Sequence, residues 1–159
     1  MRVSYEISLT PNLATIGKVT GEKIDAIEKA IKDAGAEIEL NHVDHFSKGV
    51  YARELHIPAG TVLTGKIHKF QNLNIMSKGD ISVLMEDGTI KRVQAPFTVV
   101  SPPGTRRVAY AHTDCVWTTI HGTEKTDVDE IEKEFIAQTP GDYQLFCEEA
   151  RLSLCHGQQ

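Results

Sequence analysis

The chain has 159 residues, a length typical of one domain, with 40% hydrophobic and 25% charged residues. Its formal net charge of −5 excludes the broad basic surface that binds nucleic-acid polymers, so we expect no such partner. No apolar run approaches the roughly 20 residues of a membrane span, and residues 1–12 carry no signal-peptide pattern. The three cysteines (Cys115, Cys147 and Cys155) form no Cys-x-x-Cys pair and no disulfide framework. The sequence therefore predicts a cytoplasmic protein with no membrane attachment.

Residues 1–49 are predicted to form an N-terminal strand and helix. Apolar residues alternate along residues 2–9, which is typical of a half-buried strand. Isoleucines recur at helical spacing in residues 21–34, with Thr20 as the candidate N-cap and Gly35 as the candidate residue after the helix. The helix is amphipathic, so we expect its apolar face to pack on another part of the protein or on a partner.

Residues 50–121 are predicted to form a β-core. Short apolar-rich runs are separated by turn signals such as Pro58-Ala59-Gly60, Lys78-Gly79-Asp80 and Pro102-Pro103-Gly104. Asp87-Gly88 lies between two strand-like runs and predicts a hairpin. This pattern favours a closed or sandwiched antiparallel sheet.

Residues 122–159 are predicted to form two helices. The first has an apolar stripe of Val128, Ile131 and Phe135, with Thr126 as its cap at capping-box spacing from Asp129. Its acidic run, residues 127–134, is interpreted as a solvated face.

The second C-terminal helix is predicted to begin after Thr139, which acts as its cap, with Pro140 in the first helical position. Its apolar stripe consists of Tyr143, Phe146, Cys147 and Ala150. The order strand, helix, β-core and two helices predicts a single domain over residues 1–159.

Two glycine-containing frames recur in the β-core. In the first, Gly60 is followed after five residues by Lys66-Ile67-His68, then by Asn72, and after six more residues by Gly79. In the second, Pro102-Pro103-Gly104 is followed by Arg107 and then by Ala111. These frames resemble the paired motifs of the cupin superfamily, whose members are small antiparallel jelly-roll barrels. The resemblance implies a mainly β, single-domain, cupin-like barrel over residues 50–121.

Most of the metal ligands that the cupin motifs imply are replaced in this chain. Lys66 occupies the position of the first motif histidine, Asn72 that of the glutamate and Arg107 that of the later histidine, so only His68 is retained. Because lysine and arginine repel a dication, we expect no cofactor. The alternative is a divalent metal held by His68 with histidines from other strands, namely His56, His112 or His121.

The same replacements suit an anion. The resemblance implies that Lys66, His68, Asn72, Asn74 and Arg107 face the barrel interior, where lysine and arginine bind phosphate or carboxylate. The asparagine amides would then read a base or sugar edge. The sequence predicts a small anionic ligand at this site.

Two aromatic residues, Tyr110 and Trp117, are candidates for stacking on a flat ring of that ligand. Alternation from Arg107, however, turns Tyr110 and His112 to the opposite face of their strand. His112 is then interpreted as a residue that caps a turn.

Structural alternatives remain for each charged candidate. Lys66 can place its head in solvent, Arg107 can pair with Glu54 or Glu86, and His68 can be a hydrogen-bonded barrel histidine. The cluster His42-Val43-Asp44-His45 is interpreted as an exposed loop, and His121 as a strand-end residue bonded to a loop carbonyl.

A further resemblance concerns the segment ARELHIPAGTVLTGKIHK, which is similar to small cupin-like proteins encoded by tailed phages. It implies a role in the host cytoplasm, where a non-catalytic protein would sequester a nucleotide-derived immune signal. Two other functions stay open. One is an enzyme, either a metal-dependent dioxygenase or a metal-free isomerase or epimerase that uses His68. The other is an assembly scaffold, and a homodimer or higher homo-oligomer is expected.

Overall fold

The computed structural model of the chain describes residues 5–6, 21–85 and 87–156. The N-terminal elements and the first strands of the barrel are β1 (Tyr5–Glu6), α1 (Gly21–Asp33), β2 (His42–Ser47), β3 (Val50–Ile57), β4 (Thr61–Thr64), β5 (Ile67–His68) and β6 (Asn72–Lys78). The remaining elements are β7 (Asp80–Leu84), β8 (Ile90–Gln94), β9 (Phe97–Ser101), β10 (Val108–Ala111), β11 (Cys115–Gly122), α2 (Val128–Phe135), β12 (Ile136–Ala137) and α3 (Pro140–His156).

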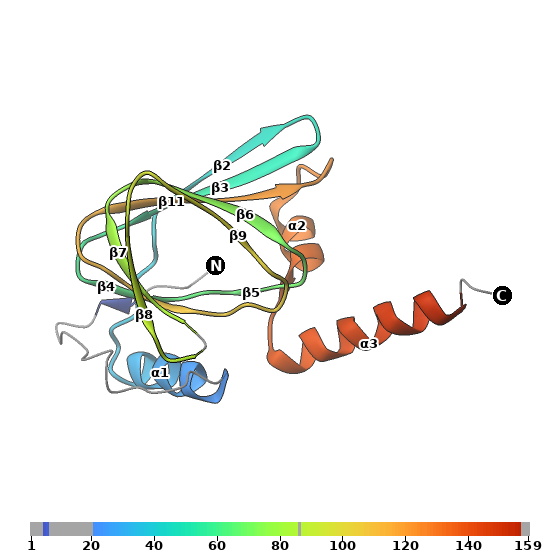
Figure 1. The fold of residues 1–159 in the computed structure, drawn as a ribbon, viewed down its shortest axis with the longest axis horizontal. Coiled ribbons are helices and arrows are strands. Elements are labelled where there is room, and N and C mark those ends of the chain that lie inside the picture. Colours follow the sequence, from blue (N-terminus) through green and yellow to red (C-terminus); the bar gives the residue numbers. More distant parts are fainter. Residues whose placement is uncertain (1–4, 7–20, 86, 157–159) are drawn as a thin grey trace.

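The strands form two antiparallel sheets of five strands each, in the orders β1-β4-β10-β7-β8 and β2-β3-β11-β6-β9. A short ladder of β5 and β12 lies beside α2 at one end of the barrel (Figure 1). Neighbouring strands are distant in sequence, as where β3 pairs with β11 and β4 with β10, which is the jelly-roll arrangement. The predicted single-domain jelly-roll barrel, with an N-terminal strand and helix and two C-terminal helices, is confirmed.

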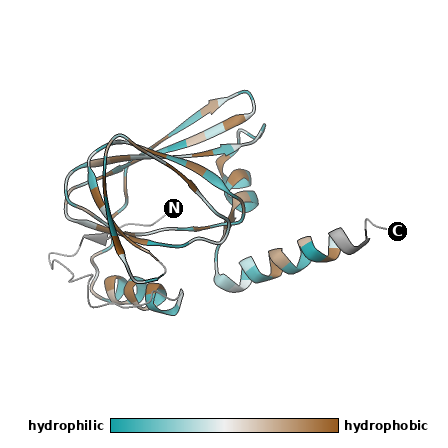
Figure 2. Cartoon of the chain, viewed as in Figure 1, coloured by the Kyte–Doolittle hydropathy of each residue, from teal (hydrophilic) through white to brown (hydrophobic). Residues whose placement is uncertain are grey.

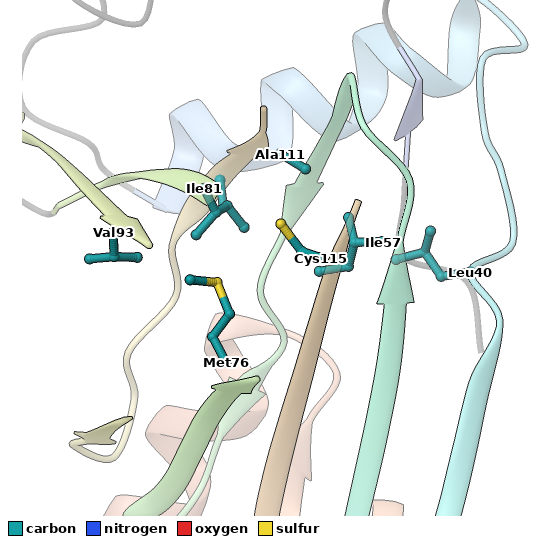
Figure 3. Close-up of a cluster of buried hydrophobic side chains, with 8 residues drawn as sticks. Leu40, Ile57, Met76, Ile81, Val93, Ala111 and Cys115 are labelled. Atoms are coloured by element: carbon teal, nitrogen blue, oxygen red, sulfur yellow. The ribbon is translucent and has the colours of Figure 1, made fainter. Parts of the chain in front are cut away.

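The core lies between the two sheets. Apolar and polar residues alternate along many of the barrel strands (Figure 2), and several strands, such as β7 with Ile81 and Val83, turn apolar side chains inward. In Figure 3, the side chains of Met76, Ile81 and Cys115 converge from β6, β7 and β11, and none is more than 2% exposed. Ala111 of β10 is buried in the same cluster.

Helix α1 covers the outer face of the first sheet. Ile24 packs against Val62, Leu84 and Val108, which point away from the barrel interior. The helix is also held by polar contacts, because Arg106 forms ion pairs with both Asp25 and Glu28 of α1. The amphipathic helix predicted for residues 21–34 is confirmed, and its partner is this sheet.

The predicted helix ends agree with the structure in two of the three places that it describes. Gly35 follows α1 with a φ of +63°, as predicted. At α3, Thr139 Oγ1 accepts from the Asp142 amide and Asp142 Oδ2 accepts from the Thr139 amide, a reciprocal capping box. The predicted cap of α2 is wrong by one residue, because Asp127 accepts from the Glu130 amide at 2.9 Å and replaces Thr126.

Other predictions have mixed outcomes. The hairpin around Gly88 is confirmed, with Leu84 opposite Ile90 in the β7–β8 pair. The loop predicted for His42–His45 is wrong, because these residues form the first part of β2 and pair with β3. Thr20, and all of residues 2–9 except Tyr5 and Glu6, lie outside the described residues.

None of the described helices combines the length and the apolar character needed to cross a membrane. Cys115 is buried and free, and Cys147 is exposed and free.

The two glycines of the first sequence frame both adopt positive φ, +84° at Gly60 and +102° at Gly79. Their surroundings differ. No heavy atom would lie within 4 Å of a Cβ at Gly60, whereas at Gly79 a Cβ would lie 2.5 Å from Cys115 Sγ and 2.6 Å from the Asp114 carbonyl oxygen. Gly79 is therefore required for both its backbone conformation and its close contact with β11.

These two positions allow a matched test of that requirement. Gly60→Ala should lower the free energy of unfolding by roughly 1–2 kcal/mol, the cost of a left-handed conformation in a residue with a side chain. Gly79→Ala should cost more, about 3 kcal/mol or above, because a steric clash is added to the same strain. Urea denaturation measures both values, and equal losses would contradict the steric account of Gly79.

Candidate functional site

A cavity of about 280 Å³ lies inside the barrel, between the two sheets and beneath α2. Its polar lining residues include Arg53, Lys66, His68, Asn72, Asn74, Ser101, Arg107, Thr119, His121 and Glu132. Its apolar lining residues include Leu55, Leu63, Val83, Val93, Phe97, Val99, Trp117, Ile131 and Phe135. The cavity is thus polar on one part of its wall and apolar on the rest, a composition typical of small-molecule sites.

Lys66 lies in the cavity wall and is held by a carboxylate from α2. Its Nζ donates to Glu132 Oε1 at 3.1 Å, and Arg53 Nη1 donates to the same oxygen at 2.7 Å. Burial lowers the pKa of Lys66, and the charge of Glu132 only partly opposes this effect. The alternative in which Lys66 places its head in solvent is wrong, since the side chain is mostly buried and ion-paired.

Glu132 corrects a second expectation, that residues 127–134 form a solvated face. Asp129 and Glu130 are exposed, but Glu132 points into the cavity. Burial tends to raise the pKa of Glu132, but the hydrogen bond from Arg53 and the charge of Lys66 outweigh it and lower the pKa. Glu132 is therefore an ionised internal partner for two cations.

Asn74 is the centre of a buried hydrogen-bond network. Its Nδ2 donates to Asn72 Oδ1 at 2.7 Å and to Ser101 Oγ at 3.1 Å. Its Oδ1 accepts from Trp117 Nε1 at 3.1 Å and from Thr119 Oγ1 at 2.8 Å. These four bonds use the full capacity of the amide, so Asn74 positions its neighbours and has no group left to read a ligand edge.

Arg107 lines the cavity beside this network. Its Nη1 donates to Ser101 Oγ at 3.3 Å, and no ion pair joins it to a carboxylate within the described ranges. Glu54, one of its predicted alternative partners, instead contacts His45 and His56, and Glu86 lies outside the described residues. The Arg107 guanidinium is thus presented to the cavity with only a hydroxyl as its polar side-chain partner there.

His68 and His121 stack on each other in the cavity wall, with ring centroids 5.2 Å apart and planes 22° apart. His121 also packs on Phe135 of α2, at 4.4 Å between centroids. The Nδ1 atoms of both histidines are buried and lack a hydrogen-bond partner. Burial, aided for His68 by His121 and Lys66 and for His121 by Arg53, lowers the pKa of each to about 4. Both imidazoles are therefore neutral at pH 7.

The two aromatic candidates lie on opposite faces of the barrel wall. Trp117 lines the cavity and is oriented by its bond to Asn74. Tyr110 packs with Val62 and Leu84 on the outer face beneath α1, and its ring meets that of His112 edge-on. The structure thus places Trp117, but not Tyr110, where it can contact a ligand in the cavity.

The remaining histidines and Asp44 lie mainly on the strands near the cavity. Asp44 accepts from Tyr51 Oη at 2.6 Å and from Arg53 Nε at 2.9 Å, so it orients the arginine that contacts Glu132. His42 and His45 are both exposed, and His42 also lines the cavity near Asp44. His112 lies in the bend after β10, and its ring contacts Ser82 Oγ of β7 at 2.6 Å in place of the predicted turn cap.

Across the described parts of the chain, no group of three or more His, Cys, Asp or Glu side chains is arranged to hold a metal ion. His68 and His121 are the imidazoles that come together in the cavity wall. Their other charged neighbours include Lys66 and Arg53, which would repel a dication. This donor set does not fit the divalent metal considered from the sequence.

Sequence reasoning missed Ser101, Arg53 and Glu132 as cavity residues. Ser101 lies opposite Asn72 in the β6–β9 register, so period-two alternation from Asn72 would have found it once the pairing was known. Glu132 carried no such signal, because it sits one residue from the apolar stripe of an acidic helix.

Fold and cavity define a small jelly-roll barrel protein with an internal pocket of mixed polarity. No known family profile and no curated protein matches this sequence. Among solved structures, the chain is similar to a cupin-2 domain containing protein from Shewanella frigidimarina, at 13% identity and a TM-score of 0.45, covering 64% of this chain and 98% of that one.

Two further solved structures are similar to this chain. A conserved protein with a double-stranded β-helix domain from Klebsiella pneumoniae has 12% identity and a TM-score of 0.47, covering 56% of this chain and 81% of that one. A cupin domain from Bordetella pertussis has 14% identity and a TM-score of 0.42, covering 53% of this chain and 93% of that one. These values describe a distant likeness in architecture and say nothing of a ligand or an activity.

The buried pair of His68 and His121 predicts that the protein loses stability as the pH falls. Because each folded-state pKa is lowered from 6.5 to about 4, the unfolded chain binds more protons below pH 6.5. Stability should be complete above about pH 6.5, fall as the pH drops toward 4, and level off below it. The loss is on the order of 3 kcal/mol per histidine, at about 1.4 kcal/mol per pKa unit.

Denaturation at a series of pH values checks this, and His121→Phe should flatten the pH dependence by removing one of the two groups. An NMR titration provides a direct measurement of each imidazole. If His68 and His121 both titrate near pH 6.5, the buried neutral pair is wrong.

Proposed function

We propose that the protein binds a small anionic ligand in the barrel cavity and releases it chemically unchanged. The observation that carries this proposal is Arg107, whose guanidinium lines the cavity and contacts only the Ser101 hydroxyl among the described side chains. A buried or half-buried cation without a carboxylate partner is costly, and an anionic ligand would compensate it.

The charge balance of the cavity supports an anion. Its described lining includes Arg53, Lys66, Lys91 and Arg107, against one carboxylate, Glu132. Glu132 forms ion pairs with Arg53 and Lys66 next to α2, so its negative charge does not neutralise the cations elsewhere in the cavity. The positive excess therefore lies at Arg107 and Lys91, of which Arg107 is half-buried and Lys91 is exposed.

Binding without turnover is supported by the state of His68. A general base works best when its pKa lies near the working pH, whereas the pKa of His68 is lowered to about 4. No carboxylate hydrogen-bonds its Nδ1, so the imidazole also lacks an orienting partner. An isomerase or epimerase that uses His68 is correspondingly less favoured.

The narrower hypothesis, a phage protein that sequesters a nucleotide-derived immune signal in the host cytoplasm, remains a proposal that rests on the sequence resemblance. The cavity of about 280 Å³ lies at the small end of ligand pockets, which span roughly 300–1,000 Å³. A ligand with a single compact anionic group suits that volume better than one with two nucleotides.

The experiment that tests the proposed function uses Arg107→Ala. Small molecules released by denaturing the purified protein are identified by mass spectrometry, and their rebinding is measured by equilibrium dialysis. Arg107→Ala should weaken binding by about tenfold or more, since a hydrogen bond to a charged group contributes roughly 1.5–3 kcal/mol. The matched control is Arg92→Ala, which removes an equal charge from an exposed side chain paired with Asp80 outside the cavity. Unchanged binding in Arg107→Ala would show that the ligand site is elsewhere.

Self-association is a separate proposal. Leu73 and Val100 lie opposite each other on the outer face of the second sheet, and both are exposed. Leu145 and Leu152 on α3, which extends away from the barrel in Figure 1, are 59% and 58% exposed. Exposed apolar side chains grouped in this way are typical of protein interfaces.

We therefore expect a homodimer or a higher homo-oligomer in solution. Size-exclusion chromatography with light scattering measures the molar mass, and Leu145→Glu with Leu152→Glu should lower it if α3 forms the contact. A mass of 17.6 kDa for the unmodified chain at all concentrations would contradict the proposal.

A further inference from the structure

We infer that the ligand is an amphiphilic monoanion, with a carboxylate head bound at Arg107 and an apolar body packed along the inner wall of the barrel. This inference rests on the proposed function and names the chemical class of its ligand. Three features of the cavity support this inference. They are the number of uncompensated cations near the hydrogen-bond network of Asn74, the hydrogen-bond donors that remain unused, and the composition of the rest of the wall.

The charge near the hydrogen-bond network matches one negative charge. Lys66 and Arg53 share the Glu132 carboxylate, and Lys91 lies over the Phe97 ring, 5.3 Å from its centroid. This leaves the Arg107 guanidinium as the cation at the network to be neutralised. A monoanion balances it, whereas a phosphate monoester would carry a second charge into a largely apolar cavity at a cost in desolvation.

The unused donors lie close together and suit a carboxylate. Ser101 Oγ accepts from both Asn74 and Arg107, which fills its two lone pairs and leaves its proton to donate. The planar guanidinium fork of Arg107 has further N–H groups for the same head. A carboxylate accepts from both residues at once.

Apart from the His68–His121 pair, the rest of the wall is mainly apolar and offers few partners to a polar body. Leu63, Val83, Phe97 and Trp117 pack against the core cluster and turn their remaining surface to the cavity. The amide best placed to read a ring edge, that of Asn74, is already saturated. The hydroxyls of a ribose or the edge of a base would lose water without replacement, at roughly 1–3 kcal/mol for each unpaired group. An aliphatic or aromatic body gains instead from every apolar contact.

Trp117 provides the measurement, because it is the single tryptophan of the chain and lines the cavity. Its fluorescence is followed while the protein is titrated with sodium octanoate, with 1-octanol as the neutral analogue, and with AMP and inorganic phosphate as polar anions. A probe that does not itself change the fluorescence is ranked by how well it competes with octanoate. Octanoate should bind saturably and at least about tenfold more tightly than the other three probes.

Two pairs of variants distinguish the contribution of the carboxylate head of the ligand from that of its apolar body. Arg107→Ala should remove the preference for octanoate over 1-octanol, and Arg92→Ala should retain it. Val99→Thr replaces a methyl group on the cavity wall by a hydroxyl of nearly the same size, and it should weaken octanoate binding several-fold. Val100→Thr makes the same change on the outer face of the same strand and should have no effect. Circular dichroism confirms that each variant is folded before it is titrated.

The outcomes distinguish this inference from the proposed function. If AMP or phosphate binds in an Arg107-dependent way and octanoate does not, the amphiphilic class is wrong and the anion site stands. If octanoate and 1-octanol bind equally and Arg107→Ala changes neither, or if no probe binds, both proposals are overturned. Octanoate binding that depends on Arg107 and is weakened by Val99→Thr supports both.

Discussion

Four hydrogen bonds meet at the side-chain amide of Asn74, and the polar half of the barrel interior depends on them. A buried amide that lacked any of these partners would be costly, so the network determines where its members lie. Through it, β6 orients Trp117 on β11 and Ser101 on β9, and Ser101 in turn contacts Arg107. A single asparagine thus sets the relative positions of an aromatic ring, a hydroxyl and a guanidinium that come from distant parts of the chain.

A second constraint is electrostatic and comes from outside the barrel. Helix α2 places Ile131 and Phe135 among apolar neighbours at the end of the barrel and Glu132 between Lys66 and Arg53. The helix both contributes to the cavity wall and neutralises part of its charge. The cavity that results is less cationic than its lysine and arginine content indicates. Of the two lining cations that pair with no carboxylate in the described part of the chain, Lys91 is exposed and Arg107 is half-buried. This distribution supports a ligand with one anionic group over a highly charged one.

Much of the barrel could be predicted from local patterns. The turns at Gly60 and Gly79, the hairpin around Gly88 and the inward positions of Asn72 and Asn74 all appear in the structure as predicted. Such features depend on residues within a few positions of one another, where backbone sterics and the period of a strand decide the outcome. The cap of α2 was missed by one position because Thr126 and Asp127 are both good capping residues, and the structure uses Asp127.

The sequence by itself predicted the sheet-rich fold, since strand alternation and turn chemistry are local, and its resemblance to cupins implied interior positions for lysine, histidine, asparagine and arginine. Only the tertiary structure decided what those side chains contact. In the folded protein all hydrogen-bonding groups of the Asn74 amide have partners, Lys66 pairs with Glu132, and His68 stacks on His121. Arg107 hydrogen-bonds the Ser101 hydroxyl. The reason is that these partners are separated by tens of residues, and hydrogen bonds and ion pairs between strands and helices depend on the register and docking that only folding establishes.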